Sequence, residues 1–222
     1  MIAVQLNKRD FEYDIHSLIR SFYPGMDVPV YQEDEPHPEG WEKKLTVDYQ
    51  SDRIRLRFLD SNETLLAEKE QQIDYEADRK ATKNVLKSML YEMLRDHTGQ
   101  ELPWGNLTGI RPTKIPMALL EQGWKNTEIA EHMRKTYYTS NEKTALSIMI
   151  ANRERHILKD VNYEDGYSLY VGIPFCPSIC LYCSFSSSPL AVWKNKVDTY
   201  LDALCKEIEA CARIYQNRKL DT

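Results

Sequence analysis

Apolar residues recur with two different periods in the first hundred positions. Residues 10–23 repeat them at helical spacing, which predicts an amphipathic helix ended by Pro24 and Gly25. The stretches "KLTVDYQ" and "RIRLRFLD" instead alternate apolar with polar or charged residues around "SD", a pattern typical of a β-hairpin with one solvated face. "MIAVQL" and "ETLLAEKEQQI" are further strand candidates, and the acidic "YQEDEPHPEGWE", interrupted by Pro36 and Pro38, is expected to be an exposed loop.

A longer helix is expected to follow, with Asp74 as its N-cap and Gly99 as its stop. Its apolar positions are Ala81, Val85, Met89, Leu90 and Met93. The predicted element order is therefore β-α-β-β-β-α, which fits an antiparallel sheet covered on one face by two helices. We interpret residues 1–100 as a small α+β N-terminal domain.

Three helix-like pieces follow between residues 101 and 160, and Asn126 and Ser140 stand where N-caps belong. Such a trio could form a helix-turn-helix, but the presumed second helix has no basic cluster. We therefore interpret residues 101–160 as a helical linker segment. Arg111 and Lys114 in "TGIRPTK" lie beside a helix start, where we expect ordinary surface ion pairs rather than an anion site.

The last segment, residues 161–222, begins with the apolar run "YSLYVGIPF", which has the length of a strand. A loop that contains cysteines follows, and then an amphipathic helix with apolar residues at Val197, Leu201, Leu204, Ile208, Cys211 and Ala212. Strand, loop and helix in this order are typical of the opening βα unit of a parallel α/β fold, whose active sites lie at the carboxyl ends of strands. Cys205 and Cys211 fall within the helix and are expected to be packing residues.

Charge and composition narrow the classes of protein that need to be considered. The formal net charge of −5, with acidic and basic residues interleaved, shows neither a nucleic-acid footprint nor a polybasic membrane patch. No window approaches the roughly 18 consecutive apolar residues of a membrane span, and "MIAVQLNKRDFEYD" becomes charged too early for a signal peptide. We expect a cytoplasmic protein with no nucleic-acid partner and no membrane span.

Three of the five cysteines, Cys176, Cys180 and Cys183, form a Cys-x3-Cys-x2-Cys array. An odd number of cysteines with such crowding suits metal or redox ligation in a reducing compartment better than a disulfide framework. A structural zinc site takes four ligands, commonly from two separated pairs, and no second pair follows here. A four-iron cluster held by three thiolates leaves one iron open to another ligand.

The stretch "YVGIPFCPSICLYCSF" resembles the Tyr-x-x-Ile-Pro-Phe-Cys-x3-Cys-x-(aromatic)-Cys signature of the oxygen-independent coproporphyrinogen III oxidase (dehydrogenase) group of radical S-adenosyl-L-methionine (SAM) enzymes. "WGNLTGIRPTKI" is similar to the variant branch of Gram-positive bacteria, which has an extra N-terminal region. The resemblance implies that Cys176, Cys180 and Cys183 ligate a [4Fe-4S] cluster. It also implies that Tyr170 and Tyr182 contact S-adenosyl-L-methionine, which binds the open iron.

The implied reaction is the oxidative decarboxylation of two propionates of coproporphyrinogen III to vinyls in haem biosynthesis, by a 5′-deoxyadenosyl radical made from SAM. The implied partners are coproporphyrinogen III or a related tetrapyrrole and an electron donor that reduces the cluster. By the same resemblance, residues 161–222 are the first βα unit of an α/β radical SAM barrel of partial TIM type. The chain is then expected to be an N-terminal portion of a longer enzyme, without turnover of its own.

Two positions depart from the pattern of the group. Gly172 stands where the group commonly has His, and Phe185 stands where the better characterised oxidases have a further Cys. These differences leave the substrate open. The alternatives are a radical SAM-like haem chaperone, which keeps the cluster but delivers haem to partner proteins, and a zinc-binding module without catalysis.

Overall fold

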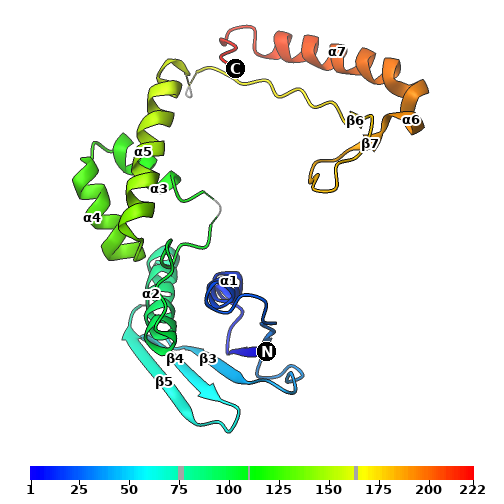
Figure 1. Cartoon of the computed structure of the whole chain (residues 1–222). Helices are drawn as coiled ribbons and strands as arrows, with labels where there is room; N and C mark the ends of the chain where they lie inside the picture. Colours follow the sequence, from blue (N-terminus) through cyan, green and yellow to red (C-terminus); the bar gives the residue numbers. More distant parts are fainter. Residues whose placement is uncertain (75–77, 110, 163–164) are drawn as a thin grey trace. The chain divides into compact units, whose positions relative to one another are not determined.

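The computed structural model of the chain describes residues 1–74, 78–109, 111–162 and 165–222 (Figure 1). They form two compact units, Met1–Arg155 and His156–Thr222. The domain boundaries expected from the sequence, 1–100, 101–160 and 161–222, stay predictions.

A five-stranded sheet with two helices forms the first part of the first unit. Its elements are β1 (Ile2–Leu6), α1 (Glu12–Phe22), β2 (Val30–Gln32), β3 (Lys43–Tyr49), β4 (Arg53–Asp60), β5 (Leu65–Gln72) and α2 (Arg79–Thr98). The strands lie in the order β2-β1-β3-β4-β5. The predicted hairpin is confirmed as β3 and β4, which pair antiparallel, and β5 pairs antiparallel with β4 as the edge strand.

The sheet is mixed: the prediction of an antiparallel sheet is correct for β3, β4 and β5 and wrong for the pairs that β1 forms. β1 runs parallel to both β2 and β3. The sequence pattern missed β2 because this strand is only 3 residues long and runs into the acidic stretch interpreted as an exposed loop. Its Tyr31 is only 5% exposed. β1, α1 and β2 thus form a βαβ unit, in which the helix returns the chain parallel to the first strand.

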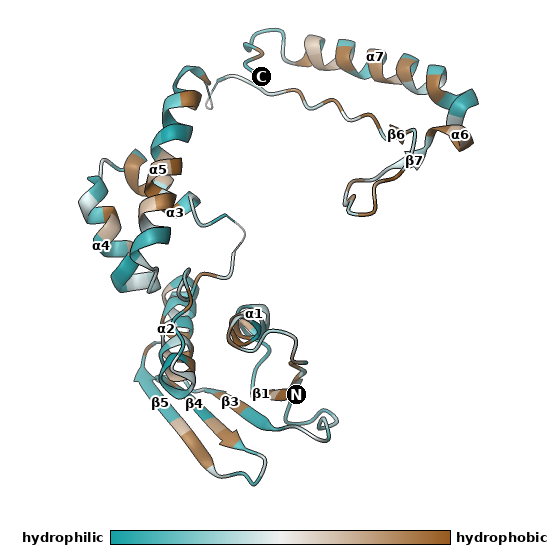
Figure 2. Cartoon of the chain, in the orientation of Figure 1, coloured by the Kyte–Doolittle hydropathy of each residue, from teal (hydrophilic) through white to brown (hydrophobic). Residues whose placement is uncertain are grey.

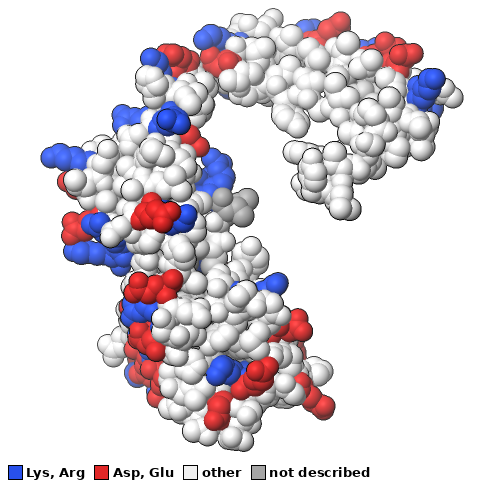
Figure 3. All heavy atoms as spheres, viewed as in Figure 1, with Lys and Arg blue, Asp and Glu red and all other residues white. Residues whose placement is uncertain are grey.

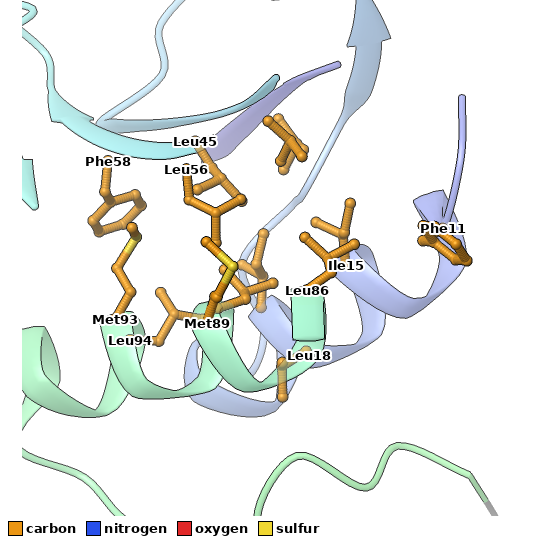
Figure 4. Packing of buried hydrophobic residues seen from close by; sticks show 14 of the residues in the cluster. Phe11, Ile15, Leu18, Leu45, Leu56, Phe58, Leu86, Met89, Met93 and Leu94 are labelled. Atoms are coloured by element: carbon orange, nitrogen blue, oxygen red, sulfur yellow. The ribbon is translucent and has the colours of Figure 1, made fainter. Parts of the chain in front are cut away.

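Both helices pack on the same face of the sheet, as the sequence predicted (Figure 1). Buried residues alternate along β3 and β4, so one face of these strands is apolar. Figure 4 shows the layer between this face and the helices, with the labelled residues Phe11, Ile15, Leu18, Leu45, Leu56, Phe58, Leu86, Met89, Met93 and Leu94. Each fully buried side chain of this size contributes about 1.5–3 kcal/mol, so this layer is the main source of stability of the unit.

The start of α2 differs from its prediction, whereas its end agrees. Asp78 is the N-cap, because its carboxylate accepts the backbone N–H groups of Lys80 and Ala81 at 2.8 and 3.1 Å. The prediction of Asp74 as the cap is therefore wrong; residues 75–77, which that longer helix would have contained, lie outside the described part. Gly99 ends the helix in the left-handed region at φ 67°, as predicted.

Three more helices follow: α3 (Lys114–Glu121), α4 (Asn126–Tyr137) and α5 (Asn141–Ile157), and the first unit ends at Arg155, within α5. They enclose a small core of Leu120, Ile129, Met133, Ile148 and Ala151. The predicted cap of α5 is confirmed, because the Ser140 hydroxyl accepts the backbone N–H of Lys143 at 3.2 Å. At α4 the cap is Lys125, one residue before the predicted Asn126, and the Glu128 carboxylate accepts the Lys125 N–H at 2.7 Å.

The turn "WGN" and the end of α4 attach these helices to α2. The ring of Tyr138 stacks on Tyr91 with centroids 4.9 Å apart, and its hydroxyl donates to Glu92 at 2.6 Å. Gly105 lies at φ +56°, and a Cβ there would meet the carbonyl oxygen of Tyr137 at 1.8 Å. Only glycine permits this close approach of two backbones.

The second unit contains β6 (Phe175–Cys176), β7 (Ser188–Pro189), α6 (Leu190–Trp193) and α7 (Val197–Ile214), together with short 3-10 turns at Leu158–Asp160 and Lys194–Lys196. The helix predicted after the cysteines is confirmed as α7. The strand predicted over residues 167–175 is wrong for most of its length, because no strand is assigned to residues 168–174. A strand needs a neighbour that pairs with it along its length. Here the N–H groups of Tyr167 and Leu169 donate to the carbonyls of Lys219 and Thr222, and β6 pairs with β7, which is too little backbone pairing for one continuous strand.

Apolar positions recur along α7, as Figure 2 shows, yet no described residue between 156 and 222 is buried. The second unit therefore has an amphipathic helix whose apolar side is only partly covered by the described residues: Val197, Leu204 and Ile208 are half-buried, and Leu201 is 41% exposed. No helix in the described ranges is both long and apolar enough to cross a membrane.

Candidate metal centre

The three clustered cysteines lie on one loop that a short parallel strand pair closes. β6 and β7 pair Phe175 with Ser188 and Cys176 with Pro189, so Cys176 sits at the base of the loop. Cys180 and Cys183 lie within it, joined by a turn in which the N–H of Cys183 donates to the carbonyl of Cys180 at 3.0 Å. Pairing at the base and a turn in the middle bring the three cysteines into one local structure.

All three thiols are free, and their exposure differs. Cys180 is exposed, whereas Cys176 and Cys183 are half-buried. The Cys183 thiol lies 3.9 Å from the carbonyl oxygen of Phe185 and 3.9 Å from the hydroxyl of Ser187. Phe185, which replaces a cysteine of the related signature, thus contributes its backbone to the loop, while its side chain is 77% exposed.

The described His, Cys, Asp and Glu residues form no group of three around a single point, as one metal ion would require. A four-iron cluster makes a different demand, because each thiolate binds its own iron and the sulfurs stay apart. Three free thiols on one loop fit that donor set. Metal sites of this kind commonly assemble as the metal binds, since their ligands must lose protons and converge at that moment.

Tyr200 of α7 holds the segment before the cysteines and was missed by sequence reasoning. Its hydroxyl donates to the carbonyl of Gly172, and its ring meets Phe175 edge-on with centroids 5.2 Å apart. Tyr200 of α7 therefore contacts Phe175, the residue directly before Cys176, and attaches the loop to the helix. No local pattern predicts this contact, because Gly172 and Tyr200 are 28 residues apart in the chain.

Tyr170 and Tyr182, the predicted SAM contacts, are 87% and 89% exposed. Within the described part of the chain, neither makes a hydrogen bond or a ring contact. Both rings are accessible to a ligand, and their role stays a prediction.

The other two cysteines do not belong to the loop. Both lie on α7, where Cys205 is exposed and Cys211 is half-buried. The expectation that Cys205 is a packing residue is wrong for the described residues, because none of them covers its side of the helix.

Two curated proteins are similar to the chain. "Oxygen-independent coproporphyrinogen-III oxidase-like protein HemZ" of Bacillus subtilis is 34% identical over 131 residues, which are 59% of this chain and 26% of the relative. "Oxygen-independent coproporphyrinogen III oxidase" of Mannheimia haemolytica is 43% identical over 55 residues, 25% of this chain and 37% of the relative. No model of a known protein family matches the chain, and no solved structure matches it.

These matches confirm the resemblance seen in the cysteine motif: the chain is similar to oxygen-independent coproporphyrinogen III oxidase-like proteins. The alignment with HemZ of Bacillus subtilis covers more than half of this chain. The chain spans only about a quarter of the length of HemZ and about a third of the Mannheimia relative.

Proposed function

We propose that the loop of Cys176, Cys180 and Cys183 holds a [4Fe-4S] cluster that binds SAM, in an oxidoreductase of haem biosynthesis. The single observation that supports this most strongly is the set of three free thiols on one closed loop, in a chain related to coproporphyrinogen III oxidases. When bound, the cluster would supply the electron that splits SAM and yields the radical that takes hydrogen from the substrate.

The donor set favours an iron–sulfur cluster over structural zinc. A closed zinc site needs four protein ligands, whereas this loop offers three thiolates, and no His, Asp or Glu among the described residues joins them. A four-iron cluster with three thiolates leaves one iron for a ligand that is not a cysteine. That open position is what the proposed function needs.

The residues of this chain have separate roles in the proposal. The three cysteines hold the irons, and Tyr200 positions the loop through the Gly172 carbonyl and the ring of Phe175. Tyr170 and Tyr182, both exposed, are the proposed contacts for SAM. Tyr200 acts through the loop, so it is a positioning residue.

We also propose that the second unit is the first βα unit of a radical SAM barrel. Its order of an extended segment, a cysteine loop and helix α7 supports this, and so does the incomplete burial of the apolar side of α7. In such a barrel, neighbouring strands would accept the hydrogen bonds of residues 168–174, and the barrel would cover the apolar side of α7.

The proposed reaction is the oxidative decarboxylation of coproporphyrinogen III, which is supported by the names of both relatives. Its proposed partners are this tetrapyrrole and an electron donor for the cluster. In the whole protein, anaerobic turnover of coproporphyrinogen III with SAM and a reductant tests the reaction. Transfer of haem to an acceptor protein without turnover would show that the haem chaperone alternative is correct instead.

The cluster itself can be tested on this chain with a matched control. Anaerobic reconstitution with iron and sulfide is expected to give a brown protein with about four irons and broad visible absorption. Cys176→Ala should lose most of this iron, because one iron loses its thiolate, whereas Cys205→Ala on α7 should keep it. A colourless protein that takes up zinc, or an equal loss of iron in both variants, would show that the assignment is wrong.

A further inference from the structure

A pocket in the first unit collects lysines from two helices. Its volume is about 590 Å³, and it lies against α2, the turn that contains Asn106, α3 and α4. Its basic residues are Lys80, Lys83 and Lys87 of α2 and Lys114 of α3, and no Asp or Glu is among its described lining residues. We call it the lysine pocket. It lies in a different unit from the cysteine loop.

The charged residues of this pocket are all positive, whereas the whole chain has a net charge of −5. In the described part of the molecule, Lys80, Lys83 and Lys114 have no ion pair. This overturns the expectation of ordinary surface pairing for Lys114. Figure 3, which shows one face, has acidic and basic side chains interspersed among uncharged ones. Like charges that share a pocket repel one another, and a bound anion would relieve that repulsion.

Lys87 extends the positive charge to the inside of the pocket. Its side chain is only 12% exposed, donates to the Thr108 hydroxyl at 3.1 Å, and lies 3.6 Å from the carboxylate of Asp14. Burial first, and the nearby charge of Lys83 as well, lower the pKa of Lys87 despite Asp14. The Asp14 carboxylate, at that distance from Lys87, neutralises only part of the positive charge of the pocket.

The spacing of the lysines indicates a ligand with several separated negative groups. Lys80, Lys83 and Lys87 follow the i, i+3, i+7 pattern of one helix face, which extends for about 10 Å along the axis. A single phosphate is small compared with this span, whereas a molecule with carboxylates on different edges can match it.

The other lining residues are half apolar and half polar. An apolar ligand body could contact Leu107, Ile115, Ala118, Leu119 and the ring of Tyr137, whereas the rest of the lining is polar: Asn84, Asn106, Gln122, His132 and Thr136. Pockets of about 300–1,000 Å³ with such linings typically enclose small organic molecules. A nucleic acid would instead need a basic track that continues beyond one pocket.

We propose that the lysine pocket binds a compact polycarboxylate with an apolar body, of which a tetrapyrrole with propionate side chains is the fitting example. The choice of a tetrapyrrole rests on the proposed function, whereas the choice of a polycarboxylate rests on the lysines that line the pocket. The N-terminal unit would then capture the substrate or product apart from the cysteine loop.

The test measures binding of coproporphyrin III, by its fluorescence, to the 222-residue chain in which Cys176, Cys180 and Cys183 are changed to Ala. Without these thiols the cluster cannot contribute to the signal. Lys83→Gln with Lys114→Gln should weaken binding by about tenfold or more, because two charge-assisted contacts are lost. Lys83→Arg with Lys114→Arg should retain most of the affinity. Circular dichroism should show that both variants keep the fold.

Arg20→Gln with Arg57→Gln is the matched control, because it removes the same charge at exposed positions outside the pocket. It should leave the affinity within about twofold, since exposed distant charges contribute little. Absence of coproporphyrin III binding, an equal loss in the control, or tighter binding of single-stranded RNA or of pyrophosphate would overturn the proposal.

Failure of the lysine pocket and failure of the cluster proposal give different results. If reconstitution gives the cluster in the unmodified chain but coproporphyrin III does not bind, the lysine pocket is wrongly assigned and the cluster proposal stands. If coproporphyrin III binds through Lys83 and Lys114 but no cluster forms, the pocket stands and the cluster proposal falls.

Discussion

Single side chains decide what the cysteine loop can do. The three thiols are its only cysteines, and Tyr182 directly precedes the third of them while remaining 89% exposed. The exposed ring of Tyr182 either packs against SAM at the proposed open iron or has no role there. Removing the ring would weaken SAM binding in the first case and change nothing in the second.

Tyr182→Ala is expected to keep the cluster and to weaken the binding of SAM in the whole protein. No iron ligand is lost, but a packing contact of about 1–3 kcal/mol with the bound molecule is removed. Iron content and reductive cleavage of SAM should be measured side by side. Loss of both would make Tyr182 a structural cover of the cluster, and no change in either would remove it from the site.

Among the elements, the contact between α2 and the end of α4 depends on one hydrogen-bonded group. Tyr138 donates to one oxygen of Glu92, and Lys69 of β5 donates to the other at 2.5 Å. β5, α2 and the turn after α4 are thus linked through a single carboxylate. Burial first, and then the hydrogen bond to Glu92, raise the pKa of Tyr138 to about 12.

Tyr138→Phe is expected to keep the stacking on Tyr91 and lose the hydrogen bond. Stability should fall by about 1 kcal/mol, since Glu92 keeps its bond to Lys69 and the site is partly solvated. The raised pKa means that the unfolded chain loses the phenolic proton first as the pH rises. The contribution is therefore complete below about pH 10, the ordinary value of tyrosine, and is lost towards pH 12.

Urea unfolding of both proteins between pH 8 and pH 12 measures this effect. The difference in the free energy of unfolding should shrink as the pH rises through that window. A difference that is constant with pH would show that the Tyr138 hydroxyl does not titrate as the structure indicates.

Hydrophobic periodicity predicted elements in which apolar residues repeat regularly over several positions, and missed a strand that is too short to show a period. β3, β4, α1 and α7 follow their periods, so their positions were predictable. β2 has only 3 residues, too few to show a period, and its parallel pairing depends on the α1 crossover. Asp74 and Asp78 are equally good caps by residue type, and only the backbone geometry chooses Asp78.

The candidate site was predictable only where its residues are close in sequence. The cysteine array is local, so its spacing alone singled it out. The lysine pocket is partly local, because Lys80, Lys83 and Lys87 share one helix face, but Lys114 joins them through the packing of α3. Tyr200 reaches Gly172 through tertiary structure, and no sequence period encodes such a contact.

For the whole molecule, the distribution of buried residues separates two kinds of structure. The first unit contains every buried residue of the described chain, and most of its buried apolar residues form one large cluster and one small cluster. The second unit has none, and its large exposed side chains include Tyr170, Ile173, Leu181 and Val192. Its stability is therefore expected to depend on what binds it, whereas the first unit contains its own core.

A fragment of residues 1–155 is accordingly expected to fold without iron, with a cooperative thermal transition that a chelator does not change. A fragment of residues 1–100 should also melt cooperatively, because the sheet, α1 and α2 form the main core. It should melt roughly 10 °C lower, since it loses the stacking of Tyr138 on Tyr91 and the packing of Leu102, together about 2 kcal/mol. Circular dichroism during heating measures both transitions. Equal melting temperatures would mean that α3, α4 and α5 contribute nothing to the first core, and a non-cooperative 1–155 fragment would mean that the first unit depends on the second.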